Sequence, residues 1–106
     1  MAILDIYPKL PGQVVVISKK HYVSYILGLP SEIQQSFLQA AGTVANLMVE
    51  KLGVERTTLI MEGLEINHAH IKLYPVYEIS DYIQKIGQKA EKAEEKQLEE
   101  VYQKFI

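Results

Sequence analysis

The segment Ile66-Asn67-His68-Ala69-His70-Ile71-Lys72-Leu73-Tyr74-Pro75 decides the fold of this chain. Its apolar and basic residues alternate, and successive side chains of a β-strand point to opposite faces of the sheet. The apolar members are Ala69, Ile71 and Leu73, and the basic members are His68, His70 and Lys72. As a strand, the segment would bury the first set in a core. The second set would form a row on the open face, with neighbours about 7 Å apart. Two imidazoles and an amine in one row suit a phosphate group.

The remaining segments predict an α+β domain with an antiparallel sheet and one main covering helix. The predicted strands are residues 2–6, 13–18, 57–61 and 66–74. The predicted helix begins at Ser31, where Ser31 and Gln34 have the spacing of a capping box, and it ends at Gly53. Because the first two strands are joined by a short turn, we expect a hairpin there. A sheet of this kind can leave one face open.

The chain divides into a predicted domain over residues 1–76 and a C-terminal helical extension over residues 77–106. In the extension we expect a long exposed helix, rich in Lys and Glu, that is interrupted near Gly87. Its last part carries an apolar stripe, which would have to pack on the domain or on a partner subunit.

Size and composition exclude several classes of protein. The 106 residues suffice for one core, and the 11 basic against 13 acidic side chains disfavour a nucleic-acid partner. The absence of cysteine excludes disulfides and thiolate metal sites. Asp5 and Lys9 interrupt the N-terminal apolar stretch, and no apolar run has transmembrane length. We therefore expect no membrane association and a cytoplasmic location.

Three blocks of the sequence carry a family resemblance. The first is DIYPKLPGQVVVISKKH (residues 5–21), the second is LPS (residues 29–31) with the helix after it, and the third is Gly63 followed by HAHIKLYP (residues 68–75). In this order and spacing they resemble the histidine triad (HIT) family of nucleotide hydrolases and transferases. The match spans about residues 3–76.

The resemblance implies a HIT-like fold and a small-molecule purine nucleotide as substrate. His70 would be the nucleophile, attacking the α-phosphate of a nucleoside ester, phosphoramidate or dinucleoside polyphosphate to form a nucleotidyl-histidine. This is reasonable chemistry, because neutral imidazole is nucleophilic near pH 7 and a covalent intermediate divides one difficult step into two. His68 would support the phosphate oxygens. No cofactor or resident metal is implied, and a homodimer is expected by analogy.

The same resemblance assigns the remaining site residues. Asp5 would accept hydrogen bonds from the ribose hydroxyls, Ile6 would contribute to the base pocket, and Gln13 would contact the substrate where relatives often carry a fourth histidine. Lys72 takes the place of the third triad histidine. It can donate to a phosphate or to a leaving atom, although its ordinary pKa of about 10.4 makes it a poor proton shuttle near neutral pH.

Two alternatives stay open at this point. Glu65 occupies a position where many relatives carry a residue that holds phosphate oxygens, and a carboxylate there would repel phosphate unless it points away or pairs with a cation. The chain could therefore be a degenerate nucleotide- or protein-binding module without turnover. A His-x-His pair could also bind a metal, with His21 or Glu65 as a third ligand.

Overall fold

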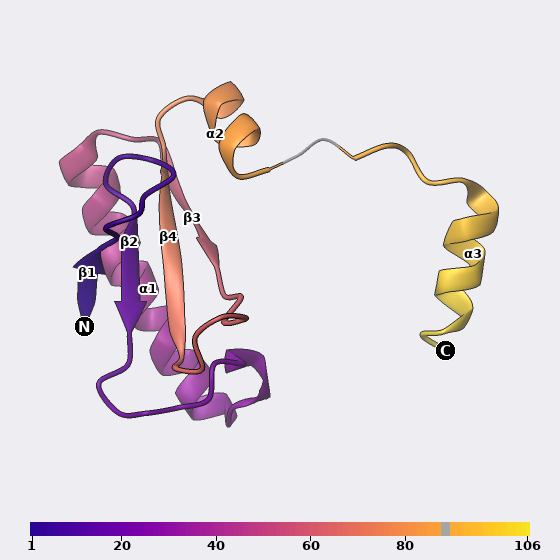
Figure 1. Ribbon diagram of the computed structural model, residues 1–106, viewed down its shortest axis with the longest axis horizontal. Helices are drawn as coiled ribbons and strands as arrows, with labels where there is room; N and C mark the ends of the chain where they lie inside the picture. The colour runs from indigo at the N-terminus through magenta and orange to yellow at the C-terminus, as the bar shows by residue number, and fades with distance from the viewer. Residues whose placement is uncertain (88–89) are drawn as a thin grey trace.

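The computed structural model describes residues 1–87 and 90–106 and shows an α+β protein (Figure 1). Its strands are β1 (Ala2–Leu4), β2 (Val14–Ile17), β3 (Arg56–Ile60) and β4 (His70–Val76). Its helices are the 3₁₀ turn Ile26–Gly28, α1 (Ser31–Leu52), α2 (Ile79–Lys85) and α3 (Glu95–Gln103). The predicted fold class is confirmed.

One antiparallel sheet organises the domain. Its four strands lie in the order β1-β2-β4-β3, and β1 and β2 form the predicted hairpin. The strand β4 is central, because it pairs with β2 on one side and with β3 on the other. The long helix α1 lies behind the sheet in Figure 1 and covers one of its faces.

The core lies between β4 and α1. Ala69, Ile71 and Leu73 are fully buried, as the alternation predicts, and they pack with Phe37 and Met48 of α1. Such side chains supply most of the favourable free energy of folding, because burial removes their apolar surface from water.

The histidine-bearing strand is shorter than predicted. The strand β4 begins at His70 rather than at Ile66, so His68 lies just before it. The preceding segment is bonded to a loop instead of a neighbouring strand: the Ala69 N–H donates to the Tyr22 carbonyl at 2.9 Å, and the Asn67 side chain accepts from the Ser24 N–H at 3.0 Å.

Helix α1 begins and ends where the sequence predicts, but its N-terminus is built differently. The residue before it is Pro30, and no side chain caps the helix. The predicted capping box is wrong, because the Gln34 side chain donates to the carbonyls of Leu27 and Leu29 at 3.1 and 2.7 Å. Gln34 thereby ties the helix to the preceding 3₁₀ turn. At the other end Gly53 adopts a left-handed φ of 67°, a conformation that glycine accepts at little cost.

The C-terminal part contains two short helices, and the first ends at Lys85, so the predicted interruption near Gly87 is present although the helices are shorter than predicted. Helix α2 is tied to the sheet by a 2.8 Å hydrogen bond between the Tyr82 and Thr58 hydroxyls. Residues 90–94 are not helical, and α3 starts at a capping box made by Glu94 and Gln97. All residues of α3 are exposed, and Figure 1 shows this helix apart from the domain. The predicted partner for its apolar stripe, and the division at residue 76, stay predictions.

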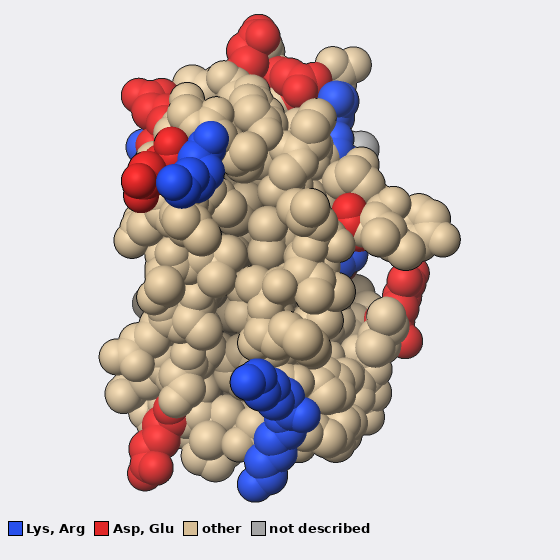
Figure 2. All heavy atoms as spheres, turned by 90° about the vertical axis from the view of Figure 1, so that its left-hand side faces the viewer, with Lys and Arg blue, Asp and Glu red and all other residues tan. Residues whose placement is uncertain are grey.

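Figure 2 shows a largely uncharged face on the side of the molecule where β1 lies. A hollow of about 290 Å³ between β1 and α1 is lined by apolar side chains, among them Ile3, Leu4 and Leu47. These three are 46, 69 and 52% exposed. The expected homodimer stays a prediction.

Among the described helices, none combines the length and apolarity needed to cross a bilayer.

Candidate functional site

The open face of the sheet carries a hollow of about 610 Å³ that contains the predicted catalytic residues. His68, His70 and Lys72 line it together. The opposite wall comes from the β1–β2 hairpin, which contributes Asp5 and Tyr7. The sequence-predicted row of basic groups is therefore present beside a space large enough for a small molecule, although His68 reaches it from outside the strand.

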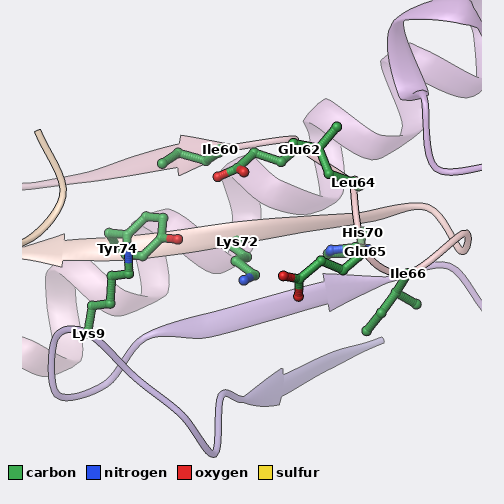
Figure 3. Close-up of a pocket in the computed structure, with 10 residues that line it drawn as sticks. Lys9, Ile60, Glu62, Leu64, Glu65, Ile66, His70, Lys72 and Tyr74 are labelled. Carbon is green, nitrogen blue, oxygen red and sulfur yellow. The ribbon is translucent and has the colours of Figure 1, made fainter.

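A second hollow of about 270 Å³ adjoins the first on the side of β3 (Figure 3). It is lined by Ile60, by the loop that follows β3, and by Lys9 and Tyr74. Four residues line both hollows: Glu65, Ile66, His70 and Lys72. The two spaces therefore meet at the imidazole of His70 and the amine of Lys72.

The protonation pattern of His70 follows from one hydrogen bond. Its Nδ1 lies 2.7 Å from the main-chain carbonyl oxygen of His68. A carbonyl can only accept, so Nδ1 carries the hydrogen, and the neutral ring has its lone pair on Nε2. This is the arrangement that a nucleophilic imidazole requires.

His68 has protein partners at both ring nitrogens. Its Nε2 lies 2.8 Å from the Ser18 carbonyl oxygen and 3.3 Å from the Ser18 hydroxyl. Its Nδ1 lies 3.2 Å from Nδ1 of His21. In this conformation the ring offers no free nitrogen to a ligand, whereas its main-chain carbonyl orients His70. The predicted contact between His68 and phosphate stays a prediction.

Asp5 is held by the hairpin that carries it. One carboxylate oxygen accepts from the Tyr7 N–H at 2.9 Å, and the other accepts from the Gln13 side-chain amide at 2.7 Å. Gln13 is only 2% exposed, and its side-chain carbonyl accepts from the Lys9 N–H at 2.9 Å. The substrate contact predicted for Gln13 stays a prediction, and its observed bonds position Asp5. Ile6 is 82% exposed, and its neighbours Asp5 and Tyr7 line the larger hollow.

Charged groups of both signs surround the junction of the hollows. Figure 3 shows the Glu65 carboxylate beside His70 and Lys72, so the acidic residue that the sequence singled out does face the site. Tyr74 lies farther along β4, with its hydroxyl on the side of Lys72 (Figure 3). Burial raises the pKa of the Tyr74 phenol, and the nearby Glu62, Asp5 and Tyr82 raise it further. The phenol is therefore neutral at ordinary pH and can donate a hydrogen bond.

The loop that carries Glu65 is fastened to Ser24. The Ser24 hydroxyl donates to the Gly63 carbonyl at 2.7 Å, and the Ser24 N–H donates to the Asn67 side chain. Gly63 has a φ of 62°, and a β-carbon there would lie 2.6 Å from that of Ser24. Both the backbone conformation and the close approach require glycine at this position.

Sequence reasoning missed several residues of the site. Tyr74 could have been found, because it continues the alternation of His70 and Lys72 by one more step of two residues. Ser18 and Ser24 left no signal in the sequence, since their roles depend on how two loops pack. Across residues 1–87 and 90–106, no group of three or more potential ligands is placed to hold a metal ion.

Comparison with known proteins gives a consistent but distant match. No family model matches the chain. The chain is 28% identical over 93 residues to an uncharacterized HIT-like protein of Methanocaldococcus jannaschii, covering 83% of this chain and 70% of that protein. This similarity supports a HIT-like assignment. The sheet covered by one helix is compatible with it.

Proposed function

We propose that this protein is a nucleotidyl hydrolase or transferase acting on purine nucleoside phosphate esters, phosphoramidates or dinucleoside polyphosphates. The observation that carries the proposal is the His70 imidazole, which has Nδ1–H fixed by a carbonyl and lies where two hollows meet. The distant HIT-like relative supports the same class of protein.

In the proposed reaction Nε2 of His70 attacks phosphorus while the P–O or P–N bond to the leaving group breaks. The new N–P bond forms a nucleotidyl-histidine, and attack by water or another acceptor then releases the nucleotide and restores the imidazole. Lys72 offsets charge on the phosphoryl group and donates a proton to the leaving atom, and its amine then takes up the proton that the attacking water or acceptor loses in the second step. Asp5 accepts hydrogen bonds from the ribose, because each carboxylate oxygen keeps a second lone pair beyond the bond described above.

The position of Glu65 bears on the competing function, a nucleotide- or protein-binding module without turnover. Its carboxylate lines both hollows, where it would repel a phosphate by itself. Lys72 lines the same two hollows, and in our proposal its positive charge offsets that repulsion.

The test compares His70→Ala and His70→Asn with the unmodified protein. The Asn variant keeps an amide that can donate to the His68 carbonyl but has no nucleophilic nitrogen, so it controls for the lost hydrogen bond. We expect both variants to lose at least about a thousand-fold in the rate of AMP release from adenosine 5′-phosphoramidate. Mixtures quenched with denaturant at alkaline pH, where the N–P bond of a nucleotidyl-histidine survives, should yield a nucleotidylated protein from the unmodified chain alone, detected by mass spectrometry.

Two other outcomes would contradict the proposal in different ways. Turnover that survives in His70→Asn would mean that another group is the nucleophile. Binding of AMP by the unmodified protein, measured by calorimetry, with no product from any of the three substrate classes would establish the binding module instead.

A further inference from the structure

His21 and His68 form an imidazole pair beside the site. Their Nδ1 atoms are 3.2 Å apart, and their rings meet edge to face with centroids 5.2 Å apart. His21 belongs to the loop after β2, and His68 immediately precedes Ala69 and β4. The contact therefore joins two segments that are distant in the sequence.

The hydrogens of this pair can be assigned from the neighbouring groups. Because the Ser18 carbonyl only accepts, Nε2 of His68 carries a hydrogen. In its neutral form His68 then has a lone pair on Nδ1, and the Nδ1–H of His21 donates to it. If His68 becomes protonated, the direction reverses and His21 accepts. If both rings are protonated, two N–H groups face each other and the hydrogen bond is lost.

The same loop also holds the peptide unit that orients His70. The His68 carbonyl and the Ala69 N–H belong to one planar peptide group. This N–H donates to the Tyr22 carbonyl at 2.9 Å, and the carbonyl accepts from Nδ1 of His70 at 2.7 Å. Residues 18–22 therefore fix the His68 ring at both nitrogens and fix the adjacent peptide plane.

We propose that His21 is a positioning residue for the nucleophile. Its hydrogen bond holds the His68 ring in one orientation. The fixed ring keeps the His68 carbonyl directed at Nδ1 of His70, so that the reactive lone pair stays on Nε2 of His70. This inference rests on the proposed function for its effect on turnover, but the arrangement of hydrogens that it requires can be observed without any substrate.

The experiment uses three variants of the full chain. His21→Phe keeps a ring but removes the donor, whereas His21→Asn places an amide nitrogen at about the position of Nδ1. His21→Ala removes the ring altogether and serves as a second variant without a donor if His21→Phe does not fold. Thermal unfolding confirms that each chain is folded before it is compared.

The first readout is ¹⁵N NMR of the imidazoles without ligand. In the unmodified protein at neutral pH we expect a lone pair on Nδ1 of His68 and a hydrogen on Nδ1 of His70. The folded variants without a donor should show a mixture of the two tautomers on His70, and His21→Asn should preserve the unmodified pattern. Unchanged His70 signals in His21→Phe and His21→Ala would overturn the proposal.

The second readout is kcat/KM at pH 7. The variants without a donor should lose about ten-fold, which corresponds to about one hydrogen bond, and His21→Asn should remain within about three-fold of the unmodified protein. An equal loss in His21→Asn and His21→Phe would reject the role. If no chain turns over substrate, the proposed function fails, and the NMR result still decides the positioning.

Discussion

Successive residues of the segment that leads into and forms β4 point to opposite faces of the sheet. The residues on the two faces differ in burial and in charge. Ile71 and Leu73 are fully buried against α1, whereas His70 and Lys72 line two hollows that are open to solvent. The first side stabilises the fold and the second side can bind and react. Because side chains in a strand alternate, one short segment can do both with no residue serving two purposes.

The separation between the two sides is not complete. Tyr74 lies on the side of His70 and Lys72, yet it is only 3% exposed. Its register partner Thr58 is hydrogen-bonded to Tyr82 of α2, so α2 lies close to this end of the sheet. Substitutions along β4 should therefore produce three kinds of effect: loss of stability, loss of turnover, and a pH-dependent change in stability.

The largest effect on the fold is expected from Leu73→Ala. Removing a fully buried leucine should lower the free energy of unfolding by about 2–5 kcal/mol, because the site loses burial and gains a cavity. The matched control is Leu59→Ala, since Leu59 lies directly opposite Leu73 in the register but is 41% exposed. Denaturant unfolding of both variants measures the difference. Equal losses would show that the burial difference does not decide stability here.

A smaller effect, on turnover alone, is expected from Lys72→Met. The substitution keeps an apolar stem and removes the charge, so stability should change by less than about 0.5 kcal/mol. Under the proposed function, kcat should fall about 10- to 100-fold because the leaving atom loses its proton donor. Lys72→His, which restores the usual triad residue, should retain more activity than Lys72→Met. Lys51→Met on α1 is the control, and a wild-type rate in Lys72→Met would remove Lys72 from the mechanism.

The smallest effect is expected from Tyr74→Phe and appears only at alkaline pH. Because the pKa of Tyr74 is raised in the folded state above its ordinary value of 10.0, the folded state resists ionisation of the phenol. The unfolded chain therefore gains the advantage as the pH rises through and beyond about 10, and stability is lost there. The free energy of unfolding of Tyr74→Phe should decline less between pH 8 and 11. Tyr102→Phe, on exposed α3, should behave like the unmodified protein, and parallel curves for all three would contradict the assignment.

Much of the fold could be predicted from the sequence because it depends on periodic burial. The alternation in β4 reports directly which side of the strand faces the core, and Gly53 reports where α1 ends. The capping box failed because Gln34 has two acceptors in the preceding turn, and no local pattern reveals them. The predicted interruption near Gly87 is present, but the helices before and after it are shorter than predicted, because Lys and Glu pairs favour a helix without determining where it begins and ends.

The candidate site was only partly predictable for a related reason. The residues on β4 follow from alternation, and Asp5 follows from the family resemblance. The contacts of Ser18 and His21 with His68, and of Ser24 with Gly63, cross between loops, whereas Gln13 bonds Asp5 within the turn of the β1–β2 hairpin. These contacts depend on backbone paths that a single sequence does not encode in any regular spacing.

The two bonds of Ser24 to the loop over residues 63–67 have a consequence for ligand entry. A segment fastened near both of its ends to a neighbouring chain has little freedom to swing open and shut like a flap. An incoming molecule should therefore meet walls that are already in place, so that association would require little ordering of the protein and should proceed without a slow conformational step.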